Sequence, residues 1–128
     1  MGINWTFKDY LAASGHNEIH AWLNAQSPAV KAEINSFILF LEASVPLLRH
    51  PHAHDIKGHS DLLELRRKAG GVQYRPLCCY GPRRQEVTIL LGASKKGSVW
   101  APKNALSDAQ SRVTPSKIAG RTTDHDFS

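Results

Sequence analysis

The fold is decided by three short apolar stretches: Leu63-Glu64-Leu65-Arg66, then Gly70-Gly71-Val72-Gln73-Tyr74-Arg75, then Ile89-Leu90-Leu91-Gly92-Ala93-Ser94-Lys95-Lys96. Large apolar side chains alternate with others in these stretches, which is typical of β-strands. Each stretch also contains or ends in a cation. A sheet that repeatedly places Arg and Lys at its surface is expected to hold something anionic.

Length and charge limit the number of domains and the kind of partner. The chain has 128 residues, the size of one ordinary domain. We expect residues 1–112 to form that domain, with residues 113–128 as a polar tail that either belongs to it or is loosely ordered. The net charge is +5, but residues 49–103 hold eleven Lys and Arg against four acids, leaving the rest at −2. Positive charge concentrated in this way attracts nucleic-acid phosphate or an acidic protein segment. The alternative is that the charge only favours solubility and has no binding partner.

Several classes of protein are disfavoured. No run of about 18 apolar residues is present to span a membrane, and no secretory signal is visible. Cys78 and Cys79 are adjacent, a spacing that suits neither a disulfide nor a metal site. We therefore expect two reduced thiols in a cytoplasmic protein without cofactor or metal.

Histidines gather in one link of the chain without any recognised zinc spacing, which disfavours a metal site there: His50, His52, His54 and His59. Histidine titrates near neutrality, so one of the group could serve as a general base. His54, His59 and, in the tail, His125 are the alternatives for that role.

Apolar residues at helical spacing predict a helix over residues 16–26. Ser27-Pro28 is typical of the cap and first residue of a second helix, which we expect to run to Pro46. Leu39 and Phe40 widen its apolar face, so the sequence predicts a heavily buried helix. The two helices should form an antiparallel hairpin.

Strands are expected over residues 3–7, 63–68, 72–80 and 87–91, with an irregular link over 48–60 and a short helix over 102–112. Gly70-Gly71 indicates a hairpin turn, and Pro76 predicts a bulge or an unpaired side in its strand. The predicted architecture is α+β: the helical hairpin packs on one face of a small twisted antiparallel sheet, whose other face is free to carry the cations.

The order of these segments resembles the RelE/ParE superfamily of toxins, closest to its phage-derived HigB-like branch. The resemblance covers roughly residues 3–112 and is carried by Leu63-Glu64-Leu65-Arg66, Tyr74-Arg75, Tyr80, Ile89-Leu90-Leu91 and Lys95-Lys96, with Glu18-Ile19-x-x-Trp22-Leu23 upstream. The chain departs from the branch at Gly92-Ala93-Ser94, where His-Gly-Phe is common, and lacks a late tyrosine, for which Trp100 lies nearest. The resemblance implies a RelE-like, microbial-ribonuclease-like fold.

The resemblance also implies a function: the toxin of a type II toxin–antitoxin system, acting as a metal-independent, ribosome-dependent mRNA endoribonuclease that inhibits translation. A ParE-like gyrase inhibitor without nuclease activity and a degenerate RNA- or antitoxin-binding module are the alternatives. The implied partners are the ribosome, mRNA and a cognate antitoxin, a HigA-like helix-turn-helix protein joined with the toxin in a hetero-oligomer.

Metal-free RNA cleavage needs cations on the phosphate and groups that move protons. Arg66 and Arg75 offer bidentate guanidinium groups for the phosphate, with solvated strand arginines as the alternative. The other candidate catalytic residues, for proton transfer, are Lys95, Lys96 and Tyr80. Candidate RNA-binding residues are Arg67, Lys68, Arg83, Arg84, Trp100 and Lys57. Trp100 is suited to stacking an extruded nucleotide.

Overall fold

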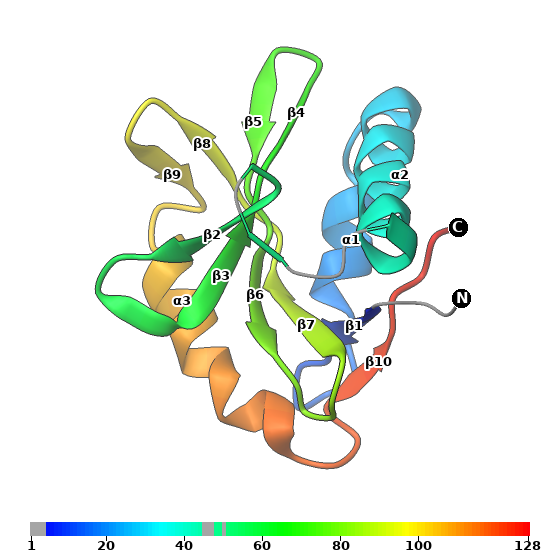
Figure 1. Ribbon diagram of the computed structural model, residues 1–128, viewed down its shortest axis with the longest axis vertical. Coiled ribbons are helices and arrows are strands. Elements are labelled where there is room, and N and C mark those ends of the chain that lie inside the picture. Colours follow the sequence, from blue (N-terminus) through cyan, green and yellow to red (C-terminus); the bar gives the residue numbers. More distant parts are fainter. Residues whose placement is uncertain (1–4, 45–47, 50) are drawn as a thin grey trace.

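The computed structural model describes residues 5–44, 48–49 and 51–128, and the predicted α+β fold is confirmed (Figure 1). The helices are α1 (Glu18–Asn24), α2 (Pro28–Ser44), α3 (Ala105–Val113) and the short 3-10 helix η1 (Pro115–Lys117). The Ser27 hydroxyl accepts a hydrogen bond from the Val30 N–H at 3.2 Å, as a helix cap should. The predicted helical hairpin therefore begins its second helix where the sequence indicates.

The strands form two sheets. The larger contains, in spatial order, β10 (Thr122–Asp124), β1 (Thr6–Tyr10), β7 (Glu86–Leu91), β6 (Leu77–Tyr80), β3 (His59–Leu65) and β2 (Ala53–Ile56). The smaller contains β4 (Arg67–Ala69), β5 (Val72–Tyr74), β8 (Ser94–Lys96) and β9 (Val99–Ala101). β1 pairs with β7 in parallel, so the larger sheet is mixed, whereas the sequence predicts antiparallel pairing alone. β2 and the start of β3 occupy much of the predicted irregular link.

Three strand paths continue from the larger sheet into the smaller one: β3 into β4, β6 into β5 and β7 into β8. Backbone bonds carry the pairing across the bend, from Leu65 N–H to Pro76 O at 3.0 Å and from Arg75 N–H to Ala93 O at 2.8 Å. The register shifts just after Pro76, where the sequence predicts a bulge. At Gly92 a Cβ atom would lie 2.1 Å from the Trp22 ring, so the bend requires glycine. Beyond it, β4–β5 and β8–β9 separate as two hairpins (Figure 1).

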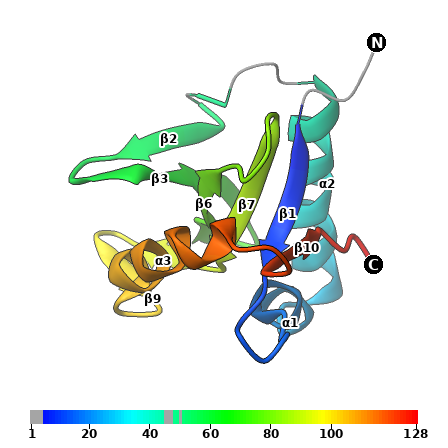
Figure 2. The same ribbon diagram turned by 90° about the horizontal axis from the view of Figure 1, so that it is seen from below.

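Helices cover both faces of the larger sheet. α1 and α2 pack near β1, β7 and β4, while α3 packs on β3, β6 and β7 from the opposite side (Figure 2). The expectation of a free second face is therefore wrong for this sheet. The reason lies in α3, which presents the small buried residues Ala105 and Ala109 and can approach the strands closely. The face left open to cations belongs instead to the smaller sheet.

Exposure along α2 differs from the prediction. Leu39 is 54% exposed and Phe40 is 44% exposed, so the expectation that they add to a heavily buried face is wrong. The residues that face the sheet are Ile34, Phe37, Ile38 and Leu41, all buried. This stripe already fills the contact, and the two additional apolar residues lie outside it.

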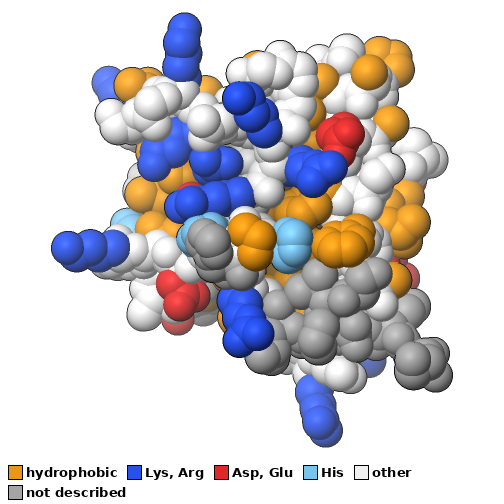
Figure 3. All heavy atoms as spheres, turned by 45° about the horizontal axis from the view of Figure 1, so that its top comes forward, with side chains coloured by type: hydrophobic (Ala, Val, Ile, Leu, Met, Phe, Trp, Pro, Cys, Tyr) orange, Lys and Arg blue, Asp and Glu red, His pale blue; other side chains and the backbone are white. Residues whose placement is uncertain are grey.

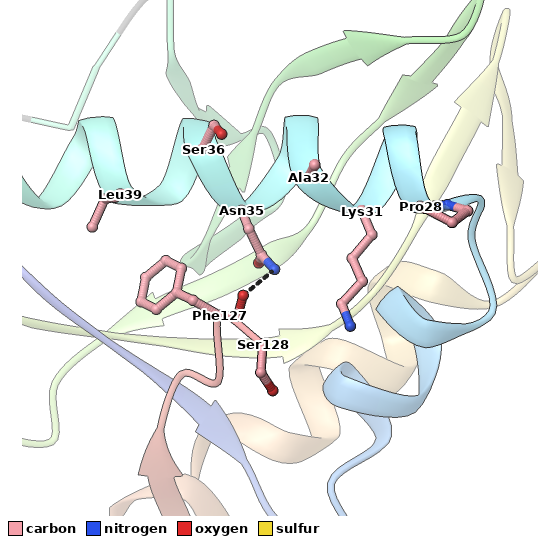
Figure 4. A pocket seen from close by; sticks show the side chains of 8 residues that line it. All are labelled: Pro28, Lys31, Ala32, Asn35, Ser36, Leu39, Phe127 and Ser128. Carbon is pink, nitrogen blue, oxygen red and sulfur yellow. Dashed lines mark hydrogen bonds between the residues drawn. The ribbon is translucent and has the colours of Figure 1, made fainter.

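Residues 113–128 end in β10 and a segment that lies along α2. Phe127 and Ser128 line a pocket of about 410 Å³ beside α2, and Asn35 Nδ2 donates a 3.4 Å hydrogen bond to the Phe127 carbonyl (Figure 4). His125, a candidate base, is buried in this segment. Its ring nitrogens lie 2.6 Å from Asp9 Oδ1 and 2.8 Å from Asn35 Oδ1.

The adjacent cysteines are free and buried. Burial raises the pKa of the Cys78 thiol well above its ordinary value and also raises the pKa of Cys79. Both thiols are therefore held in their protonated, weakly reactive form.

Candidate functional site

Arg66 and Arg75 lie opposite each other at the bend between the sheets. Arg67 pairs with Tyr74 on one side of them, and the Leu65–Pro76 backbone bond flanks them on the other. Residues opposite one another in an antiparallel pair point to the same face. The strand pairing thus brings together the two guanidinium groups that the sequence assigns to phosphate.

The buried carboxylate of Glu64 lies between these arginines. Its Oε1 accepts a hydrogen bond from Arg66 Nε at 2.8 Å, lies 2.8 Å from Arg66 Nη2 in the ion pair, and lies 3.9 Å from Arg75 Nε. The Glu64 side chain is only 6% exposed, whereas that of Arg66 is 41% exposed. Arg66 therefore presents part of its guanidinium group to solvent while Glu64 holds it from behind.

Arg75 is more enclosed, with a side chain that is 13% exposed. Its Nε is buried without a hydrogen-bond partner within the described residues. Burial lowers the pKa of Arg75, the nearby Glu64 carboxylate raises it, and the Arg66 charge lowers it again. Two guanidinium groups share a single carboxylate, so an anion placed between them would relieve their repulsion and form charge-assisted hydrogen bonds.

His54 joins this group from β2, where it pairs directly with Glu64 of β3. Such cross-strand neighbours have Cβ atoms about 4.5–5.5 Å apart and share a face. The sequence leaves His54 open as one of three alternative bases but gives no role to Glu64. The alternation of Glu64 with Leu63 and Leu65 does predict that Glu64 shares a face of the strand with Arg66. The pattern does not indicate that this face is buried.

A row of polar side chains extends the site along the smaller sheet. Lys68 pairs with Gln73, Gln73 with Lys95, and Lys95 with Trp100. Arg75 donates a hydrogen bond to Gln73 Oε1, which connects the row to the arginines. Figure 3 shows Lys and Arg side chains gathered on this side of the molecule. The open face of the smaller sheet is thus a cationic strip.

Two predicted residues adjacent to this strip point away from it. Lys96 pairs with Val99 and, by strand alternation, faces the side opposite Lys95. Arg67 forms an ion pair with Glu33 of α2, and its guanidinium carbon lies 5.2 Å from the centroid of the Phe37 ring. Both cations are therefore separated from Arg66 and Arg75 by the sheet itself.

The remaining predicted residues lie elsewhere. Lys57 is exposed between β2 and β3, while Arg83 and Arg84 are exposed between β6 and β7. Tyr80 ends β6, with its ring 5.6 Å from that of Trp5. Burial raises the pKa of Tyr80, and the Asp55 charge adds to this effect. The structure does not bring these four side chains to the arginine pair.

The other histidines have different surroundings. His59 Nδ1 lies 3.4 Å from Gln110 Oε1, and His52 packs beside Phe37 and Phe40. His125 belongs to the buried contact with Asp9, and His50 lies outside the described residues. Of the three candidate bases, His54 is the one that pairs with Glu64. We call Glu64, its neighbour His54 and the two arginines, Arg66 and Arg75, the Glu64 cluster.

No group of three or more His, Cys, Asp or Glu residues suited to a metal occurs within residues 5–44, 48–49 and 51–128. Across those ranges no helix has the length and apolar character required to cross a bilayer.

Comparison with known protein families gives a match over most of the chain. The family described as phage derived protein Gp49-like (DUF891) matches residues 21–114, a range that includes the Glu64 cluster and the cationic strip. No curated protein and no solved structure matches the chain.

Proposed function

We propose that this chain, which belongs to the phage-derived Gp49-like family, is a toxin that cleaves messenger RNA on the ribosome. The family is associated with the RelE-like toxins of toxin–antitoxin systems, and so implies an antitoxin as partner. The observation that carries the proposal is the placement of Arg66 and Arg75 around the buried carboxylate of Glu64.

Cleavage proceeds by internal transfer. The ribose 2′-oxygen loses its proton and forms a bond to the adjacent phosphorus, while the bond from phosphorus to the 5′-oxygen breaks. The 5′-oxygen takes up a proton and leaves as a hydroxyl, and the upstream fragment ends in a 2′,3′-cyclic phosphate. The protein must supply a proton acceptor, a proton donor and cations for the extra charge on the phosphate oxygens.

The Glu64 cluster offers a residue for each task. Arg66 and Arg75 hold the non-bridging phosphate oxygens, where a well-placed donor contributes roughly 3 kcal/mol to transition-state stabilisation. Glu64 accepts the 2′-hydroxyl proton, and its neighbour His54 donates a proton to the leaving oxygen. Acid–base assistance of this kind contributes about 10²–10⁴-fold in rate. Lys68 and Lys95 bind the flanking phosphates.

The primary experiment combines the purified chain with translating ribosomes and a defined message. Primer extension should reveal discrete cuts, with 5′-hydroxyl and cyclic phosphate ends, only when ribosomes are present. Arg66→Ala and Arg75→Ala should each reduce the cleavage rate about 10²–10³-fold. Arg67→Ala is the matched control, because Arg67 is a neighbouring strand arginine that faces α2, and it should cleave normally.

A contrary result is equally clear. Inhibition of DNA gyrase supercoiling by wild-type protein, together with intact message, would replace this proposal with the ParE-like alternative. Each variant is also assayed for binding to its antitoxin, so that loss of folding is not mistaken for loss of chemistry.

The acid and base can be assigned separately with a modified substrate. A 5′-thio leaving group departs without protonation. It should therefore restore cleavage by His54→Ala but leave Glu64→Gln inactive. Rescue of Glu64→Gln and not of His54→Ala would reverse the two roles.

A further inference from the structure

A pocket lies where the two hairpins of the smaller sheet diverge. β5 and β8 pair only at Gln73 with Lys95 and at Tyr74 with Ser94. Beyond these pairs the two hairpins separate (Figure 1). A pocket of about 480 Å³ occupies the divergence, and residues from both hairpins line it, including Val72, Gln73, Ser94, Lys95 and Trp100. This volume is within the usual range for small-molecule sites.

The lining joins an aromatic ring to polar donors. Gln73, Lys95 and Trp100 form one cross-strand row, and the Lys95 Nζ lies 5.0 Å from the centroid of the Trp100 ring. The Gln73 oxygen accepts a hydrogen bond from Arg75, which leaves its amide nitrogen to donate. The pocket therefore brings hydrogen-bond donors and an aromatic ring together, with the Lys95 ammonium over one face of the Trp100 ring.

The same row connects the pocket to the arginine pair. Gln73 lines the pocket and contacts Arg75, which itself lies opposite Arg66. A chain of phosphates held at the arginines would consequently carry its next nucleotide toward Trp100. Bases of single-stranded RNA are recognised by stacking on aromatic rings and by hydrogen bonds to their edges.

We propose that this pocket binds one unpaired nucleobase of the RNA, next to the phosphate held by Arg66 and Arg75. The inference rests on the proposed function for the identity of the polymer as RNA. A base in a duplex cannot leave its partner to enter without an energetic cost, so the pocket restricts the protein to single-stranded RNA. Trp100 stacks the base, while Gln73 and Lys95 contact its edge.

The test measures binding rather than cleavage. A short single-stranded RNA with 2′-O-methyl groups, which cannot be cut, is compared by fluorescence anisotropy with a copy that lacks one base. Loss of the base should weaken binding to the wild-type protein roughly 5- to 150-fold, as expected from about 1–3 kcal/mol of stacking. In Trp100→Ala the two RNAs should bind equally, and Trp100→Phe should retain part of the difference.

Leu39→Ala provides the control, because Leu39 is also an exposed apolar side chain, 54% exposed, but it belongs to α2 and does not line this pocket. It should preserve the preference for the intact RNA. An unchanged preference in Trp100→Ala would overturn the pocket assignment, even if message cleavage is normal. Conversely, a Trp100-dependent preference without any message cleavage would support the pocket and count against the proposed function alone. Equal binding of both RNAs to the wild-type protein would overturn the assignment.

Discussion

Two buried carboxylates of this protein have opposite surroundings. Asp9, in β1, is fully buried and contacts His125 Nδ1 at 2.6 Å and Asn17 Nδ2 at 2.9 Å, one through each oxygen. Glu64, in β3, is nearly as buried, yet its closest partner, Arg66, reaches solvent.

The difference separates a structural cluster from a site able to bind a ligand. Each partner of Asp9 belongs to an element that the contact fixes in place: Asn17 caps α1, and His125 holds the chain end against α2 through Asn35. The partners of Glu64 carry one more positive charge than the carboxylate can neutralise. A closed polar cluster stabilises the fold, whereas the open one retains capacity for an anion.

The largest expected effect is on the closed cluster. Asp9→Ala should lower the free energy of unfolding by about 3–5 kcal/mol, because His125 and Asn17 lose their buried partner. Urea denaturation measures the loss. Asp124→Ala is the control, since that carboxylate pairs with Lys8 but is 80% exposed, and it should cost about 1 kcal/mol or less. Equal losses in the two variants would erase the distinction between closed and exposed partners.

The open cluster should respond in activity rather than stability. Glu64→Gln keeps the shape of the side chain and removes the charge that orients Arg66 and that accepts the proton in the mechanism we propose. We expect the rate of message cleavage to fall about 10²–10⁴-fold, with a loss of unfolding free energy smaller than that of Asp9→Ala, because the main partner of Glu64, Arg66, keeps its access to solvent. Ribosome-dependent cleavage and urea denaturation are measured on the same preparation. If the variant loses stability but its folded fraction cleaves the message at the normal rate, Glu64 is a structural residue like Asp9.

Removal of the Phe127 ring, which packs beside the closed cluster around Asp9, should have a smaller effect on stability. Phe127 packs edge-on against His125, with ring centroids 4.7 Å apart, and is 38% exposed. Phe127→Ala should therefore cost about 1 kcal/mol of stability, and leave message cleavage unchanged. Thermal unfolding detects the shift. A cleavage defect in this variant would connect the chain end to the arginine pair and contradict their separation.

The smallest effect is expected at Arg67, a cation excluded from both clusters. Its ion pair with Glu33 is solvent-exposed on both sides, so Arg67→Ala should change stability by about 1 kcal/mol or less. Affinity for single-stranded RNA should also remain close to wild type. A loss as large as that of Arg66→Ala would show that charge alone, and not the face on which it lies, determines binding.

Local patterns in the sequence predict the strands, the glycine turn and the shared face of Glu64 and Arg66, because strand alternation depends only on neighbouring residues. They do not predict the burial of Glu64, because the residues beside it, His54 of β2 and Arg75, come from other segments that separate parts of the sequence supply. The strand β2, with His54, was missed for a related reason: its residues alternate weakly and pair at the sheet edge. Strand alternation places the side chains of Lys95 and Lys96 on opposite faces of the sheet. The number of cations in this segment does not reveal that difference.

The passage of three strands from one sheet into the other has a consequence for how this protein can diversify. The arginine pair lies on backbone that continues into the buried strands of the larger sheet, so a change of backbone conformation there would shift those strands. The two hairpins diverge beyond the bend (Figure 1), and their tips are exposed to solvent, with Gly70 close to Val30 of α2. Mutation can therefore change their loops and the lining of the pocket, and with them the nucleotide that we propose binds there, while the arginine pair and the larger sheet stay as they are.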